Sequence, residues 1–172
     1  DVNTTDIRDA MRLGCRTMQS VFDADDEKGV PFFGSQVRPE CFLRFSWAHS
    51  ESHVPGRHLN AMLAAENSAG VVVDEDSIEQ HARAAFFSYS GPVALTLNRK
   101  EIGGPLKIFS PHNLREGFHA LYALARFRNS SQALDIAEAS IDVILDLWNP
   151  GQGWDLDRLT GELGLEASQG HY

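Results

Sequence analysis

The chain has 172 residues, 42% of them hydrophobic, which suffices for one domain with its own core. Its 24 acidic and 15 basic residues give a formal net charge of −9, which argues against binding to nucleic acid or to an anionic membrane surface. No apolar run approaches the ~20 residues of a membrane-spanning helix, and no signal peptide is visible. Because the chain begins with Asp1, we expect a processed or cut product, and the sequence does not indicate its compartment.

The first two predicted helices are separated by a long aromatic segment. Apolar residues recur at helical spacing over residues 4–24 and predict a helix there. Prolines punctuate residues 30–51, which favours two brief strands or an ordered loop. Residues 53–58 lead into a second helix, because Pro55 suits a first helical turn, and Gly70 ends it.

A third helix begins after a short connection. Either Asp74 or Asp76 caps it, and the pair Gly91-Pro92 stops it. Residues 92–111 are irregular, with two apolar pieces on either side of a glycine-rich turn. This arrangement predicts a small β-hairpin.

The fourth and fifth helices form the clearest pair. Asn113 opens the fourth helix, and Glu116 stands at the spacing of a capping box. Ser130 or Ser131 caps the fifth helix, and residues 155–163 predict a weaker sixth. The fifth helix has an apolar stripe, composed of Leu134, Ala137, Ile141, Ile144, Leu145 and Trp148.

The connections between helices predict the architecture. A break of a few residues joins the fourth helix to the fifth, which forces an antiparallel αα-hairpin, and the modest connection between the second and third helices allows a second one. The other two connections are long. We therefore expect an all-α fold with minor β structure in its loops, in which residues 1–172 form a single array of helical hairpins with the long loops on one rim.

The two cysteines, Cys15 and Cys41, do not have the spacing of a metal site. One disulfide or two buried free thiols would fit, and the tendency of cysteine to behave as a small hydrophobic residue favours the thiols.

The first cluster of candidate functional residues lies between residues 47 and 58. This cluster comprises Trp47, His49, Glu51, His53, Arg57 and His58. Arg57 can hold a carboxylate through its planar guanidinium group, and Trp47 can stack on a sugar ring. The cluster therefore predicts a ligand-binding wall with His53 and His58 as further substrate contacts. The alternative is an ordered loop whose polar side chains bind backbone carbonyls.

A second cluster lies at the start of the fourth helix. His112, Glu116 and His119 share one helical face with Arg115 beside it, where the helix N-terminus favours anions. We expect Glu116 and His112 to be catalytic and Arg115 to bind substrate. The alternatives are a capping role for Glu116 and a core position for His119. Glu116 and His119 also match a dimetal motif, but its second copy is missing, so neither a metal nor another cofactor is expected.

The segments 53–60 and 110–117, each leading into a helix of a predicted hairpin, resemble the six-hairpin glycosidase superfamily. The resemblance implies an (α/α)6 toroid and a carbohydrate-active enzyme, either a glycoside hydrolase or a polysaccharide lyase, whose sugar can include uronic acids. It places the substrate cleft along Trp47, His53, Arg57, His58, His112, Arg115 and Glu116. Hydrolysis would need a second carboxyl group, from Glu51 or Glu66, whereas a lyase would need a base near an arginine.

The chain departs from this superfamily in having about half of the required helices. The toroid would be incomplete, as in a fragment of a larger enzyme. An open half-ring exposes the apolar faces of its end helices, so we expect a companion chain, a missing C-terminal segment or a homo-oligomer, besides a carbohydrate ligand. The alternative function is a non-catalytic helical-repeat module that binds a glycan or a peptide.

Overall fold

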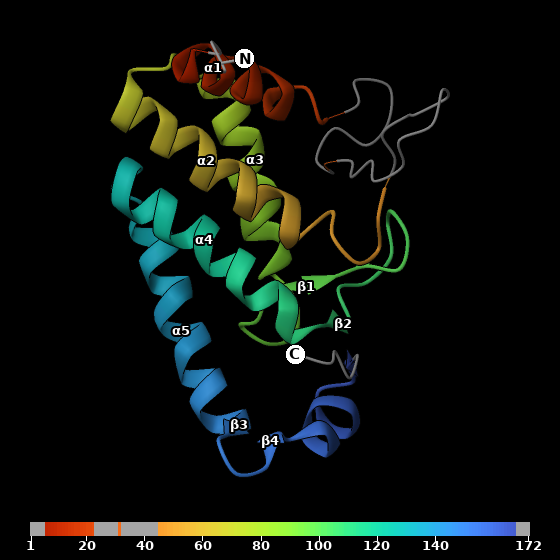
Figure 1. The fold of residues 1–172 in the computed structure, drawn as a ribbon. Coiled ribbons are helices and arrows are strands. Elements are labelled where there is room, and N and C mark those ends of the chain that lie inside the picture. Colours follow the sequence, from red (N-terminus) through yellow and green to blue (C-terminus); the bar gives the residue numbers. More distant parts are fainter. Residues whose placement is uncertain (1–5, 23–30, 32–44, 168–172) are drawn as a thin grey trace, which may run out of the picture.

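The computed structural model describes residues 6–22, 31 and 45–167, and this part is mostly helical with short strands, as expected (Figure 1). Its helices are α1 (Ile7–Gln19), α2 (His53–Ala69), α3 (Glu75–Ser88), α4 (Pro111–Arg128), α5 (Ser131–Leu147) and the π-helical turn η1 (Arg158–Glu162). Its strands are β1 (Leu97–Asn98), β2 (Ile108–Phe109), β3 (Trp148–Asn149), β4 (Gly153–Trp154) and β5 (Glu166–Ala167). Most of the segment expected as strands or loop, residues 32–44, lies outside the described residues.

Helix ends follow the local chemistry of the chain. The side chain of Asp74 accepts a hydrogen bond from Ser77 N at 3.1 Å, and that of Ser130 accepts one from Ala133 N at 3.2 Å. Each therefore satisfies a backbone donor that the first turn leaves without a helical partner. Gly70 ends α2 with φ 62°, a left-handed conformation that glycine adopts without steric cost.

Two predicted helix boundaries are wrong. The helix expected over residues 4–24 ends at Gln19, with Ser20 as its C-cap. The capping box at Asn113 does not form, because α4 begins at Pro111, after an extended Ser110. Proline favours that position, since its φ is already helical and it has no N–H to leave unsatisfied. Glu116 therefore lies in the second turn of α4, where it has no capping role.

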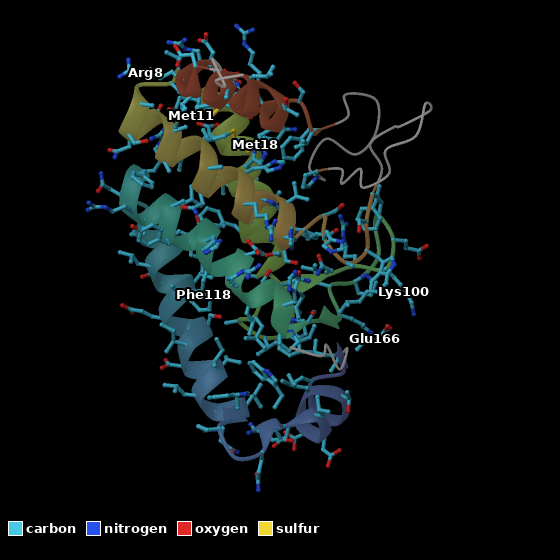
Figure 2. The ribbon with its side chains drawn as sticks, viewed as in Figure 1. Arg8, Met11, Met18, Lys100, Phe118 and Glu166 are labelled. Atoms are coloured by element: carbon cyan, nitrogen blue, oxygen red, sulfur yellow. The ribbon has the colours of Figure 1, made fainter. Side chains whose placement is uncertain are left out.

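Helices α2 and α4 run side by side in the centre of the helical part (Figure 1). Helix α3 pairs with α2 and α5 pairs with α4, so the two expected hairpins are present. From α1, Met11 and Met18 pack against the shared core (Figure 2). Cys15 is buried there as a free thiol. Cys41 lies outside the described residues. The buried core side chains of this cluster include Leu59, Met62, Leu63, Ala85, Leu121 and Leu124.

A small sheet closes one end of the hairpins. Strand β2 pairs antiparallel with β1, which confirms the hairpin expected over residues 92–111, and parallel with β5. At the edge of this sheet Lys100 Nζ lies 3.4 Å from Glu166 Oε2 (Figure 2). The sheet packs over a second core with η1, whose π-helical turn replaces the sixth helix expected over 155–163.

The apolar stripe predicted for α5 is largely not buried. Helix α5 turns a different set of residues inward, namely Ala133, Ser140 and Leu147. Four side chains of the predicted stripe are solvent-exposed, namely Leu134, Ile141, Leu145 and Trp148. The stripe extends beyond the side of α5 that α4 covers, so helical periodicity marked a face without revealing what packs on it. No helix in the described part of the chain is long and apolar enough to span a lipid bilayer.

Candidate functional site

The two polar clusters meet at the end of the molecule where α2 and α4 both begin. The rings of His53 and His112 are stacked with their centroids 5.4 Å apart. One turn further along, Arg57 Nη2 donates to Glu116 Oε1 at 3.2 Å. Segments almost 60 residues apart in the sequence thus share one surface because the two helices are parallel and packed together.

Glu116 is the centre of this surface. Its side chain is only 1% exposed, and Oε1 accepts hydrogen bonds from Arg57 and from Arg115, whose Nε lies 3.0 Å away. Oε2 lies 3.3 Å from His119 Nδ1. Burial alone would raise the pKa of Glu116, but the hydrogen bonds from Arg115 and Arg57 outweigh it and lower the pKa to about 2. Glu116 is therefore a carboxylate at neutral pH and cannot supply a proton as a general acid.

A shallow depression of about 400 Å³ opens over Glu116. Its lining is Arg57, Asn60, Ala61, Arg115, Glu116 and His119. The side chains of Arg57 and Arg115 are 54% and 58% exposed, so each guanidinium group holds Glu116 on one side and meets solvent on the other. Two positive charges face one negative charge, which leaves the depression with a net positive charge suited to an anionic group.

A third imidazole, that of His49, borders the stacked pair of His53 and His112 at the start of α2. His49 and His53 meet edge to face at 5.0 Å, and Ser46 Oγ lies 3.0 Å from His49 Nδ1. Burial and the positive charge of Arg57 lower the pKa of His53 to about 4. Burial also lowers the pKa of His49, and the charges of His112 and Arg57 lower it further. These two imidazoles are therefore neutral at physiological pH and can accept a proton.

His58, expected as a substrate contact, lies on a different side of α2 from this depression. Its Nδ1 is 3.1 Å from Nε2 of the buried His81, whose Nδ1 is 2.7 Å from the carbonyl oxygen of Ser77. A carbonyl only accepts, so His81 Nδ1 carries the proton and His58 Nδ1 donates to His81 Nε2. Burial lowers the pKa of His58 to about 3 and that of His81 to about 4, which makes the pair a neutral link between α2 and α3.

Trp47 lies 55% exposed in the turn that precedes α2. The carbonyl oxygen of Ala48, next to it, accepts hydrogen bonds from Asn98 Nδ2 at 3.4 Å and Asn113 Nδ2 at 3.0 Å. Asn98 Oδ1 also accepts from the backbone N–H of Ser52 at 3.3 Å. These two buried amides fix the turn that carries Trp47. Neither role was predicted from the sequence, which placed Asn98 only at the end of a loop near this rim and Asn113 at the start of the fourth helix.

The second carboxyl group that hydrolysis needs is not found at the depression among the described residues. Glu51 is buried away from it and pairs with Arg99 Nε at 2.8 Å; burial raises its pKa, opposed by that hydrogen bond. Glu66 pairs with Arg128 at the other end of α2 and α4. Glu116 is the one carboxylate of the lining, and in the described ranges no group of three or more His, Cys, Asp or Glu side chains could hold a metal ion.

Comparison of the chain with protein families, curated proteins and solved structures gave no match. The resemblance to the six-hairpin glycosidase superfamily therefore stays a prediction, and the functional argument rests on the geometry of the depression.

Proposed function

We propose that this chain is the part of a carbohydrate-active enzyme that recognises an acidic sugar, such as a uronic acid, at the depression over Glu116. The observation that carries the proposal is the pair of half-exposed guanidinium groups, from Arg57 and Arg115, anchored on one buried carboxylate. Anchoring fixes both groups in position before a ligand arrives, and their remaining N–H donors match the two oxygens of a carboxylate. Trp47 would supply a stacking surface for a sugar ring.

This assignment favours elimination over hydrolysis if the enzyme is catalytic. A lyase requires an arginine to neutralise the uronic carboxylate and a neutral base to remove the adjacent proton. His53, stacked on His112 one turn before Arg57, is neutral at physiological pH and is the base we propose; because it is not in the lining of the depression, the proton to be removed would have to lie towards the start of α2. A hydrolase with Glu116 as its acid would need a carboxyl group with a raised pKa, and the pKa of Glu116 is lowered. In this proposal, the hairpins belong to an incomplete (α/α)6 toroid.

A non-catalytic module that binds a glycan or a peptide is the second candidate. One observation favours it: Arg57 and Arg115 both donate to Oε1 of Glu116, the one carboxylate in the lining of the depression, so this carboxylate serves to hold two cations in place. Such a module needs the same anion-binding surface and no proton transfer.

Isothermal titration with an oligogalacturonide and with a neutral oligosaccharide of equal length tests the binding proposal. We expect the acidic ligand alone to bind, and Arg57→Gln and Arg115→Gln each to weaken it about tenfold, the loss of about 1.4 kcal/mol that one charge-assisted hydrogen bond contributes. Arg12→Gln is the matched control, because Arg12 is an exposed arginine on α1 that pairs with Asp9. Equal binding of both sugars, or no effect of either variant, would refute the proposal.

Product formation separates the two candidates. Incubation with the same oligogalacturonide should yield an unsaturated product, detected by its ultraviolet absorbance, if the chain is a lyase. Reducing ends without unsaturation, lost in a folded Glu116→Gln variant, would instead establish hydrolysis through Glu116. Binding without any product, on this ligand and on a wider panel of acidic oligosaccharides, would favour the non-catalytic module.

A further inference from the structure

Helix α5 has an exposed apolar face that nothing in the described part of the chain covers. Leu134, Ile141 and Leu145 recur at spacings of seven and four residues, so they lie along one side of the helix, and exposed Trp148 follows directly as the extended first residue of β3. Their exposed fractions range from 41% to 73%. Single exposed apolar residues are normal on proteins, but a continuous row along a helix indicates a surface that another helix covers.

The charged side chains of α5, which flank this row, are all acidic. Helix α5 contains no lysine, arginine or histidine, and its acids are all exposed, namely Asp135, Glu138, Asp142 and Asp146. Among the described residues, the cation that pairs with an acid of α5 is Arg158 of η1, whose Nη2 lies 2.7 Å from Asp146 Oδ2 and whose Nε lies 3.5 Å from Glu162 Oε2. Arg158 thus compensates Asp146, and no described lysine, arginine or histidine forms an ion pair with the other three acids of α5.

Helix α5 leads directly into the β3–β4 hairpin (Figure 1). A second depression, of about 500 Å³, is lined by the residues of this hairpin and the end of α5. Trp148 and Trp154 pair across this hairpin, and Asp155 and Asp157 add two more carboxylates to the lining. An indole face next to carboxylates is a setting that favours an ammonium or guanidinium group. The depression is therefore complementary to a lysine or arginine side chain.

We propose that α5 is the docking site of a partner polypeptide that binds as an amphipathic, basic helix. The apolar face of that helix would cover Leu134, Ile141 and Leu145, its lysines and arginines would face the acids of α5, and one basic side chain would enter the depression at Trp148. From Leu134 to Leu145 the row is about 17 Å long at 1.5 Å per residue, so about three turns of partner helix cover it.

The charges of α5 argue against a second copy of this chain as the occupant. A copy would bring the same four acids to the contact and no compensating cation from its own α5. Like charges placed face to face disfavour association, whereas a basic partner gains attraction along the whole row. The site also differs from the depression over Glu116 in its elements and in the sign of its charge.

Fluorescence anisotropy with two synthetic amphipathic helices tests the proposal, one built of leucine and lysine and one of leucine and glutamate in the same pattern. We expect only the leucine–lysine helix to bind, and the double variant Ile141→Gln/Leu145→Gln to weaken it about tenfold or more. Because both positions are exposed, the variant should keep its helical circular dichroism. Leu13→Gln, at an exposed leucine of α1, is the matched control and should bind like the wild type.

A second pair of variants tests the charge argument independently. Asp142→Lys, on α5, should weaken binding of the leucine–lysine helix more than Glu79→Lys, an exposed position on α3 with the same change in net charge. Equal effects of these two variants, or binding of the leucine–glutamate helix, would overturn the proposal. It would also fail if the wild type formed a dimer that Ile141→Gln/Leu145→Gln abolished, because the occupant would then be a second copy.

Discussion

Gly56 of α2 lies against the backbone of Glu116 of α4, so closely that a Cβ atom added at position 56 would come within 1.8 Å of the Glu116 carbonyl oxygen. Only glycine permits this approach. The contact lies one residue before Arg57, and it brings the Arg57 guanidinium group within hydrogen-bond distance of the Glu116 carboxylate. The close packing of α2 on α4 therefore creates the candidate site.

Gly56→Ala should destabilise the protein by about 3 kcal/mol or more, because a backbone oxygen cannot move aside as a side chain could. Gly14→Ala is the matched control, since Gly14 is also within a helix but a Cβ atom added there would meet nothing within 4 Å among the described residues. Removing a helical glycine there should stabilise the protein by about 0.5–1 kcal/mol. Urea denaturation measures both free energies of unfolding. A Gly56→Ala protein as stable as the wild type would contradict the packing described for α2 and α4.

The ion pairs of Glu116 predict a loss of stability in acid. Its folded pKa of about 2 lies below the ordinary 4.5, so its stabilising contribution is complete above about pH 4.5 and is lost as the pH falls towards 2. Glu116→Gln should therefore cost about 2 kcal/mol at pH 7 and remove part of the stability change between pH 4.5 and 2.5. Urea denaturation across that range measures it, with Glu79→Gln as the exposed control. Parallel curves for wild type and Glu116→Gln would contradict the assignment.

The buried histidine pair predicts a second pH dependence, at higher pH. The pKa of His81 falls from 6.5 to about 4 on folding, so the unfolded chain binds more protons in that interval and stability decreases as the pH is lowered from 6.5 towards 4. His81→Gln keeps a side chain that can donate to Ser77 and accept from His58 but does not titrate. Its unfolding free energy should depend less steeply on pH, by up to about 1.4 kcal/mol per pH unit. An unchanged slope would show that His81 does not stay neutral.

The buried pair of Glu51 and Arg99 predicts strong coupling between the turn before α2 and the end of β1. Arg99→Met should destabilise the protein by about 3–5 kcal/mol, because it leaves the Glu51 carboxylate buried without its cation. Adding Glu51→Gln should recover part of that loss by removing the unpaired charge. The double-mutant cycle, measured by chemical denaturation, checks both steps. Additive losses would mean that the two side chains do not interact.

Local sequence patterns determined most of the helices of this protein. Interactions between neighbours in the chain produce the caps Asp74 and Ser130, the stop at Gly70 and the hairpin within residues 92–111. Such interactions can be predicted from the sequence without the tertiary structure. The start of α4 is an exception. The sequence predicted a start at Asn113, but the helix begins at Pro111, because the fixed backbone of proline favours the earlier start.

Tertiary structure alone decided which of the polar residues act together. The sequence placed His53, Arg57, His112 and Glu116 in two separate segments, and the parallel packing of α2 on α4 joined them into one surface. The same packing assigned His58 to a different partner, since a helix directs residues one position apart to different sides. Within the described residues it also left the apolar row of α5 exposed. Periodicity reports which side of a helix is apolar, and only the positions of the other helices determine whether that side is buried.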